Sequence, residues 1–283
     1  MPDFLRAMAL ASERRARLAG LRLPLDDVRL RGLDAPDVIP IRLSAEGFDV
    51  IAEVKRRTPG GNGSHAPIAG DPGLPGRLAS AYARAGAAAV SVLTEPLAFG
   101  GDLRDLQSVI ETLRASEDPL PVMRKDFLVR PYQIHEARAA GADGVLLIAD
   151  MLSKAIIHPM MDALEETGLW ILVEAFADAQ FDRAVDIARE ARSRNLNALV
   201  GVNSRDLRTL AVDAERFGRL ADRLPSDIPA VAESGLSSAD DAAAAARLGY
   251  GLALVGSALV QHDDPGGLLS AMVQSGRRSR GAA

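Results

Sequence analysis

The chain has 283 residues, 48% of them hydrophobic and 25% charged, which is ordinary for a soluble globular protein. Its formal net charge of −5 argues against a nucleic-acid partner, because phosphate backbones are bound by clustered Lys and Arg. Without Cys it can have no disulfide, no thiolate nucleophile and no Cys-ligated metal. The N-terminus lacks the apolar core of a signal peptide, and no run of about 18 apolar residues occurs, so we expect a cytoplasmic protein with no membrane partner.

The first 47 residues differ in pattern from the rest of the chain. Apolar residues spread among many Arg and Ala predict one amphipathic helix over residues 3–18. An irregular connection punctuated by Pro36 and Pro40 is expected to follow it. This segment is too short to bury a core alone, so residues 1–47 are predicted to form an N-terminal helical extension.

From Phe48 onward, short β-branched apolar runs alternate with Ala- and Arg-rich helical patterns. Eight runs are predicted strands: residues 48–53, 89–93, 121–125, 144–148, 170–174, 198–202, 229–233 and 251–255. Seven patterns are predicted helices: residues 78–85, 103–115, 131–140, 160–167, 178–193, 214–224 and 238–248. Gly86, Gly141 and Gly249 suit the left-handed position just after a helix, and Thr94 and Ser238 are candidate helix caps.

This alternation predicts an α/β fold with a parallel sheet, and eight units match a (β/α)8 TIM barrel over residues 48–270. The alternative is an open doubly wound sheet, which would usually carry a Gly-rich dinucleotide turn after its first strand. Glycines 60, 61 and 63 come near such a turn, but no helix pattern starts there. Residues 271–283 contain Arg277, Arg278 and Arg280 and are expected to form a flexible tail.

Polar residues gather at the carboxyl ends of the predicted strands, where such barrels place their active sites. They are Glu53, Lys55, Lys125, Glu174, Asn203, Arg205, Glu233, Ser234, Gly256 and Ser257. Any one of them has a structural explanation as an ion-pair partner, a polar strand end or a helix cap. Their coincidence on one edge of most strands favours a reaction pocket.

Two of these strand ends are followed by turns that suit a phosphate group. Residues 233–236 and 255–258 present Gly and Ser backbone N–H groups after the seventh and eighth strands, the usual phosphate site of this fold. Lys55 would supply positive charge. Two ordinary tight turns are the structural alternative.

The remaining polar residues indicate acid–base chemistry without a metal. Lys125 stands between Arg124 and Asp126, and positive charge beside a partly desolvated ammonium is expected to lower its pKa and suit it to act as a general acid. Glu174 ends an apolar strand, where desolvation is expected to raise its pKa and suit it to accept and return a proton. The four His residues lack metal-ligand spacing, so we expect them to be structural or solvated: His65, His135, His158 and His262.

Seven motifs together resemble the indole-3-glycerol phosphate synthase family in order and spacing. They are Ile-Ala-Glu-Val-Lys at 51–55, Ser-Val-Leu-Thr-Glu-Pro at 91–96, Phe-Gly-Gly-Asp-Leu at 99–103, Arg-Lys-Asp-Phe at 124–127, Pro-Tyr-Gln-Ile at 131–134, Val-Asn-Ser-Arg-Asp-Leu at 202–207 and Glu-Ser-Gly-Leu at 233–236. The resemblance runs from about Phe48 to Leu268. It implies a lyase of tryptophan biosynthesis that needs no cofactor. Its substrate would be 1-(2-carboxyphenylamino)-1-deoxyribulose 5-phosphate, and its products indole-3-glycerol phosphate, CO2 and water.

The resemblance also implies roles for the polar strand ends. Lys125 would protonate the ribulose carbonyl as the anilino ring carbon attacks it, and Glu174 with Lys55 would move protons in the dehydration. Glu53 would orient Lys55 and the departing hydroxyl. The residues implied to position the aromatic amine and its carboxylate are Asn203, Arg205 and Glu233. Those implied to hold the phosphate are Ser234, Gly235, Gly256 and Ser257, and Thr58 would also contact the substrate.

The chain departs from the family pattern in the segment after its first strand. Thr58-Pro59-Gly60-Gly61 stands where Ser-Pro-Ser-Lys-Gly is usual, and Leu97-Ala98 where Lys-Tyr is commoner. The alternatives are therefore a paralogue acting on a substituted anthranilate derivative, a phosphoribosyl anthranilate isomerase, which commonly uses a Cys that this chain lacks, and a non-catalytic phosphometabolite-binding barrel. We expect a sugar-phosphate substrate and a monomer or weak homo-oligomer.

Overall fold

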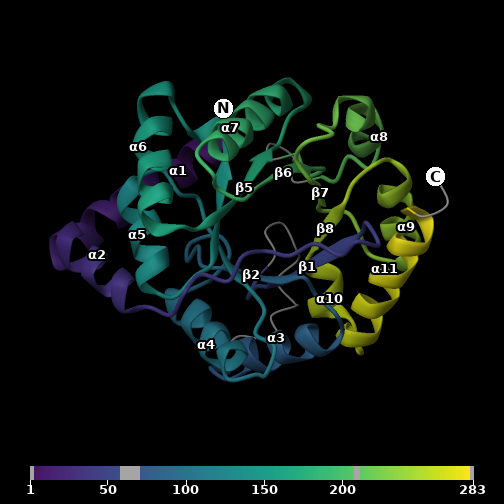
Figure 1. The fold of residues 1–283 in the computed structure, drawn as a ribbon, viewed down its shortest axis with the longest axis horizontal. Coiled ribbons are helices and arrows are strands. Elements are labelled where there is room, and N and C mark those ends of the chain that lie inside the picture. The colour runs from purple at the N-terminus through teal and green to yellow at the C-terminus, as the bar shows by residue number, and fades with distance from the viewer. Residues whose placement is uncertain (1–2, 58–70, 207–210, 281–283) are drawn as a thin grey trace.

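Eight parallel strands close into a barrel in a computed structural model that describes residues 3–57, 71–206 and 211–280 (Figure 1). Each strand pairs with its neighbours in chain order, and β1 pairs with β8. The strands are β1 (Asp49–Val54), β2 (Ala89–Leu93), β3 (Val122–Lys125), β4 (Gly144–Ile148), β5 (Trp170–Ala175), β6 (Ala198–Asn203), β7 (Ala230–Glu233) and β8 (Leu252–Val255). The predicted (β/α)8 barrel is confirmed, with every strand boundary within one residue of its predicted position.

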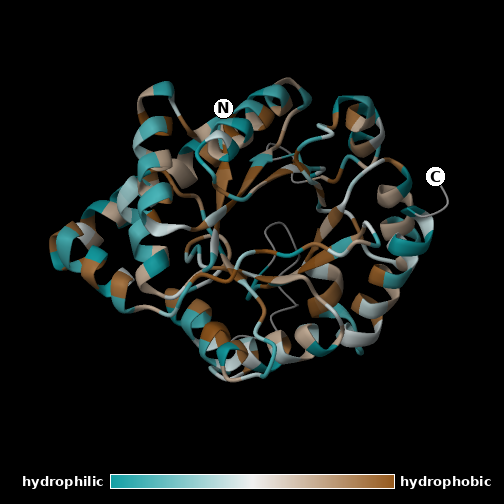
Figure 2. Cartoon of the chain, in the orientation of Figure 1, coloured by the Kyte–Doolittle hydropathy of each residue, from teal (hydrophilic) through white to brown (hydrophobic). Residues whose placement is uncertain are grey.

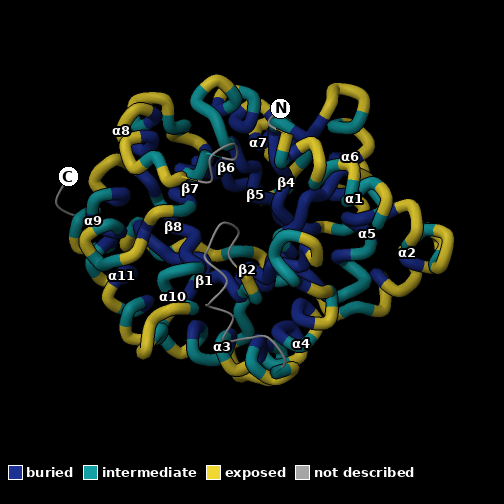
Figure 3. Tube along the Cα trace, turned by 180° about the vertical axis from the view of Figure 1, so that it is seen from behind, coloured by how far each residue is buried: buried dark blue, intermediate teal, exposed yellow. Residues whose placement is uncertain are grey.

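Helices surround the barrel in the order that right-handed strand–helix–strand units require (Figure 1). They are α3 (Leu74–Arg84), α4 (Leu103–Arg114), α5 (Pro131–Ala139), α6 (Lys154–Thr167), α7 (Phe181–Ser193), α8 (Arg216–Leu220), α9 (Ala239–Arg247), α10 (Ser257–Gln261) and α11 (Pro265–Arg280). Three short 3₁₀ segments accompany them: η1 (Ala149–Met151), η2 (Asp178–Gln180) and η3 (Ala221–Arg223). The strands are buried and the outer turns of the helices exposed (Figure 3), and Figure 2 shows the strands as largely hydrophobic.

Two apolar layers result from the alternation of side chains along each strand. One layer lies between the sheet and the helices and includes Val50, Val90 and Val200. The other fills the barrel interior and includes Ile51, Met123 and Leu172. Because successive residues face opposite layers, the register of each strand decides which of its terminal residues face the interior of the barrel.

Most predicted helix ends are confirmed, and four predictions about helices need correction. The helix predicted at 78–85 begins at Leu74, with Pro75 in its first turn. Ser238 caps α9 by accepting the Asp241 N–H at 3.1 Å, and the glycines after α3, α5 and α9 have positive φ angles. Thr94 is not a cap, because it is buried and donates to Asp126 Oδ2 at 2.9 Å. The helix predicted at 160–167 begins at Lys154, so Pro159 lies inside α6. The pattern at 214–224 forms the short α8 followed by η3.

The N-terminal segment holds two helices, α1 (Asp3–Arg22) and α2 (Leu25–Asp34), where one was predicted. The expected irregular connection is wrong for residues 25–34. Pro36 and Pro40, which predicted the irregular connection, lie beyond the C-terminal end of α2, and Pro24 directly precedes α2, a position where a missing N–H costs little. Val28 and Gly32, four residues apart, are the buried positions of α2, which packs on α5.

The expected flexible tail is wrong for residues 271–280, which belong to α11. The buried residues Leu269, Met272 and Val273 follow a helical period and lie on one face of this helix. Arg277 donates to the backbone oxygen of Phe48 at 3.1 Å and pairs with Asp49 at 2.8 Å, which ties α11 to the start of β1. In the described part of the chain no helix is long and apolar enough to cross a bilayer.

Replacing Arg277 with Met should lower the free energy of unfolding by about 1–3 kcal/mol, because Asp49 is buried and would lose its charged donor. Chemical denaturation followed by circular dichroism measures this change. Arg278→Met, at an exposed neighbouring position, is the matched control and should be within about 0.5 kcal/mol of wild type. Equal stability of the two variants would show that α11 is not anchored through Arg277.

Candidate active site

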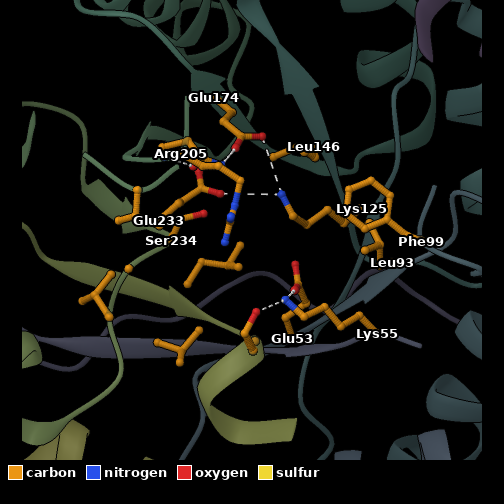
Figure 4. A pocket seen from close by; sticks show the side chains of 18 of the residues that line it. Glu53, Lys55, Leu93, Phe99, Lys125, Leu146, Glu174, Arg205, Glu233 and Ser234 are labelled. Carbon is orange, nitrogen blue, oxygen red and sulfur yellow. Dashed lines mark hydrogen bonds and ion pairs between the residues drawn. The ribbon is translucent and has the colours of Figure 1, made fainter. Parts of the chain in front are cut away.

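A cavity of about 290 Å³ opens at the carboxyl ends of the strands (Figure 4). Every predicted site residue in the described part of the chain lines it. They are Glu53, Lys55, Lys125, Glu174, Asn203, Arg205, Glu233, Ser234, Gly235, Gly256 and Ser257. Thr58 lies outside the described residues.

Strand alternation explains why these side chains meet. Residues two positions apart on a strand share a face, so each polar residue at the mouth lies above an apolar residue of the interior. The apolar residues are Ile51, Met123, Leu172 and Val231. The polar residues two positions later are Glu53, Lys125, Glu174 and Glu233. Each strand is thus apolar where it is enclosed and charged where the barrel opens.

Lys125 lies between two buried carboxyl groups on one side of the cavity (Figure 4). Its Nζ is 3.6 Å from Glu174 Oε2 and 3.7 Å from Glu233 Oε2. Asn203 donates its side-chain N–H to Glu174 Oε1 and accepts the backbone N–H of Arg205 at 2.9 Å. Strands β3, β5, β6 and β7 therefore contribute to one connected polar group.

The predicted lowering of the Lys125 pKa is wrong in direction. Burial disfavours the ammonium, but Glu174, Glu233 and Glu53 outweigh burial and raise the pKa of Lys125. Arg124 was predicted to disfavour the charged form of Lys125. However, it is the adjacent residue of β3, so its side chain points to the opposite face, towards the layer between the sheet and the helices. There it donates to Glu136 at 2.8 Å. Lys125 is therefore protonated at neutral pH and can donate a proton.

Glu233 is the carboxyl group of the cavity whose protonated form is favoured. Burial and the neighbouring Glu174 raise its pKa well above the ordinary value of 4.5. Both of its carboxyl oxygens are buried without a hydrogen-bond partner among the described residues. Gly201 leaves room for this group, because a Cβ there would lie 2.0 Å from Glu233 Oε1.

Lys55 forms a second cationic centre on the opposite side of the cavity (Figure 4). Its Nζ pairs with Glu53 Oε1 at 2.9 Å and donates to Ser257 Oγ at 2.8 Å. Burial acts to raise the pKa of Glu53, but Lys55 and Lys125 outweigh burial and lower it, so Glu53 is ionised. Gly256 makes room for this pair, since a Cβ would lie 2.2 Å from Glu53 Oε1.

The turns after β7 and β8 border the cavity beside Lys55. Ser234 and Gly235 both have positive φ angles, 65° and 77°, and Ser204 donates to the Ser234 carbonyl at 2.9 Å. Gly256 and Ser257 form the second turn. Gly has no side chain and the Ser side chain is small, so the backbone N–H groups of these turns are left open to a ligand, as anion-binding turns require.

The two lysines at the cavity mouth are unusual for this chain. Only three of its 33 basic residues are Lys, at positions 55, 125 and 154, and two of these line the cavity. An Arg side chain does not release its proton in proteins, whereas a Lys ammonium can exchange one. The residue type at both positions therefore fits proton transfer better than simple charge balance.

Three Phe residues form an aromatic wall of the cavity that was not predicted. Phe4 from α1 meets the Phe127 ring edge-on at a centroid distance of 6.1 Å, and Phe99 lies 6.1 Å from the same ring. All three residues line the cavity. Phe127 could have been found from sequence, because it is two positions after Lys125, but no sequence signal places Phe4 there.

No group of three or more His, Cys, Asp or Glu side chains that could hold a metal ion occurs in residues 3–57, 71–206 and 211–280. His135 is buried in α5, and burial lowers its pKa. His158 is exposed and lies 3.1 Å from Glu190. His65 lies outside the described residues.

Comparisons with known proteins agree on one family. Residues 36–271 match the sequence model of a family described as "Indole-3-glycerol phosphate synthase". The chain is 46% identical over 256 residues to the protein of that name from Nocardioides sp., which covers 90% of this chain and 89% of the relative. It is 42% identical over 274 residues to the one from Parafrankia sp., covering 97% and 94%.

Solved structures of low sequence identity share the fold. The chain superposes on 3-hexulose-6-phosphate synthase from Salmonella typhimurium with a TM-score of 0.61 and 13% identity, covering 82% of this chain and 99% of that chain. At this identity the likeness concerns the barrel architecture alone.

The raised pKa of Glu233 predicts a specific pH dependence of stability. Above about pH 4.5 the unfolded chain loses the Glu233 proton while the folded protein keeps it, so stability falls as pH rises towards the folded-state pKa. Glu233→Gln removes this contribution. The stability of the variant relative to wild type should therefore increase from pH 4 to pH 8, by at most ~1.4 kcal/mol per pH unit.

Urea denaturation of both proteins at each pH measures this difference. Glu111→Gln, at an exposed position of α4, is the control and should follow the wild-type curve. A pH-independent difference between Glu233→Gln and wild type would show that Glu233 is ionised in the folded protein.

Proposed function

The chain belongs to the indole-3-glycerol phosphate synthase family, and on that premise we propose how its cavity performs the family's reaction. The enzyme is a carboxy-lyase of tryptophan biosynthesis that acts on a phosphorylated small molecule. It closes the indole ring of 1-(2-carboxyphenylamino)-1-deoxyribulose 5-phosphate and releases CO2 and water. One observation supports the assignment of roles. Lys125, the carboxyl groups and the two turns that suit a phosphate group all line a single cavity.

In the first step Lys125 acts as the general acid. The carboxyl-bearing ring carbon of the substrate attacks the ribulose carbonyl carbon, and the carbonyl oxygen takes the proton of the Lys125 ammonium. The Glu174 carboxylate, 3.6 Å from Nζ, keeps that ammonium charged in the free enzyme. The ring carbon then expels CO2, and the electrons of the broken bond restore the aromatic ring.

In the second step the new hydroxyl leaves as water. The aniline nitrogen supplies the electrons, Lys55 donates a proton to the departing hydroxyl, and Glu174 accepts the proton lost from the adjacent carbon. Glu53 holds Lys55 in place through its 2.9 Å ion pair. The two cationic centres thus serve two different proton transfers.

Three further residues position the aromatic end of the substrate. Asn203, Arg205 and Glu233 lie next to Glu174 and would contact the aromatic amine and its carboxylate. A protonated Glu233 suits this role, because it can donate a hydrogen bond and does not repel a carboxylate. The phosphate would be held by the turns that carry Ser234, Gly235, Gly256 and Ser257, with Lys55 nearby.

The domain bounds, the cellular compartment, the oligomeric state and the role of Thr58 are further proposals. Residues 48–280, which include the whole of α11, would form the catalytic barrel, and residues 1–47 its N-terminal extension. We propose that the enzyme works in the cytoplasm as a monomer or weak homo-oligomer, without a nucleic-acid partner, and that Thr58 contributes to substrate binding.

Lys125→Met and Lys125→Arg should both lower kcat by ~10²-fold or more, the usual contribution of a positioned acid. The Arg variant keeps the charge but not the ability to release a proton. The ultraviolet absorbance of the indole product measures the rate. Lys154→Arg, at the third Lys of the chain and on the exposed start of α6, should leave kcat unchanged.

An inactive wild type would contradict the assigned reaction itself. Full activity of Lys125→Arg would remove Lys125 from the role of acid while leaving the reaction in place.

Ser257→Ala should mainly weaken substrate binding. It removes the hydroxyl that accepts a hydrogen bond from Lys55 and that borders the proposed phosphate site. We expect KM to rise by about tenfold, which corresponds to about 1.4 kcal/mol, with kcat within threefold of wild type. Initial rates over a range of substrate concentrations separate the two constants. A lower kcat with an unchanged KM would place Ser257 in the chemical step instead.

A further inference from the structure

An arginine from outside the barrel joins the two loops that carry the aromatic wall. Arg15 lies on α1, and its guanidinium contacts Glu95 Oε1 at 3.3 Å and Asp126 Oδ1 at 2.6 Å. The side chains of these acids are 0% and 2% exposed, whereas that of Arg15 is 27% exposed. Two buried carboxylates after adjacent strands therefore share one cation that belongs to the N-terminal extension.

Each of these carboxylates holds the backbone of one aromatic residue. Glu95 accepts the N–H groups of the loop after β2, including that of Phe99 at 3.2 Å. Asp126 accepts the N–H of Phe127 at 2.8 Å. Arg124 and Thr94 also hold Asp126, through its other oxygen, at 3.3 and 2.9 Å. Arg15 is the group that links this carboxylate to Glu95, and so links the backbone of Phe127 to that of Phe99.

Phe4 and Lys125, which also line the cavity, are connected to the ion pairs of Arg15 with Glu95 and Asp126. Phe4, on the same helix as Arg15, packs on Phe127. Asp126 follows Lys125 directly in the chain, and Phe99 and Lys125 both line the cavity. A change in the position of Asp126 would move both the aromatic wall and the proposed acid.

Helix α1 has other anchors that do not depend on Arg15. Ser12 accepts a hydrogen bond from Gln133 at 2.8 Å, Glu13 pairs with Arg130, and Leu5 is buried in the interior cluster. Loss of the guanidinium should therefore leave α1 on the barrel and change the geometry of the wall.

We propose that Arg15 is a positioning residue that sets the aromatic wall of the cavity through Glu95 and Asp126. This inference rests on the proposed function, and it adds that the aromatic wall faces the aryl ring of the substrate. It makes the N-terminal extension a part of the substrate site rather than a cover of the barrel.

Steady-state kinetics of the full chain with the carboxyphenylamino ribulose phosphate tests this role. Arg15→Met should raise KM about tenfold and lower kcat/KM by about 10- to 100-fold, since small misplacements of bound groups carry such costs. Arg15→Lys, which keeps the positive charge but lacks the forked guanidinium, should restore part of the loss. Arg14→Met is the matched control, because Arg14 is exposed and makes no ion pair in the described part of the chain.

A purely structural role would lower the unfolding temperature of Arg15→Met and leave its KM at the wild-type value, and this outcome would overturn the proposal. If Arg15→Met does not fold, Arg15→Gln decides in its place, with the same expected rise in KM.

Amide hydrogen exchange without substrate separates this inference from the assigned reaction. In Arg15→Met, the amides of residues 97–99 and 127 should exchange faster than in wild type while the amides of β5 and β6 do not change. Unchanged exchange at these four amides would overturn the role of Arg15 even if the wild type is active. An inactive wild type with locally faster exchange would overturn the assigned reaction and leave the positioning role standing.

Discussion

The alternation of side chains along closed parallel strands is the constraint on which the rest of this structure depends. Every second residue faces the barrel interior, so the last inward residue of each strand must meet the others at one mouth. Charged groups in such a position are partly removed from water and must compensate one another. The acids and bases of the cavity therefore form one electrostatic unit.

That unit explains the protonation states that the chemistry needs. Glu174 and Glu53 raise the pKa of Lys125, while burial and the crowding of Glu174 and Glu233 favour the protonated form of Glu233. Lys55 and Lys125 in turn keep Glu53 ionised. A proton donor, a neutral carboxyl group and an anionic orienting group thus arise from one shared environment, and none of these states belongs to a residue taken alone.

The N-terminal extension adds to the barrel what its strands do not provide. Polar strand ends supply acids and bases, but an aryl ring needs a flat apolar surface, and α1 contributes Phe4 to it. The helix is attached through ion pairs and hydrogen bonds to residues after β2 and β3. Its attachment therefore lies on the same side of the cavity as Lys125, where a change in position affects both binding and chemistry.

Strand order, barrel closure and the polar strand ends Glu53, Lys125, Glu174 and Glu233 were predictable from local patterns, because a period of two fixes which residues share a face. The sequence did not reveal α2 and α11, whose ends are set by packing on α5 and by the contact of Arg277 with Asp49. The predicted direction of the Lys125 pKa shift was also wrong, since Arg124 is its neighbour in the chain but faces the opposite layer. Pattern along the chain determines which groups reach the mouth, whereas their charge states and the ion pairs of Arg15 depend on distances between segments that only the folded chain brings together.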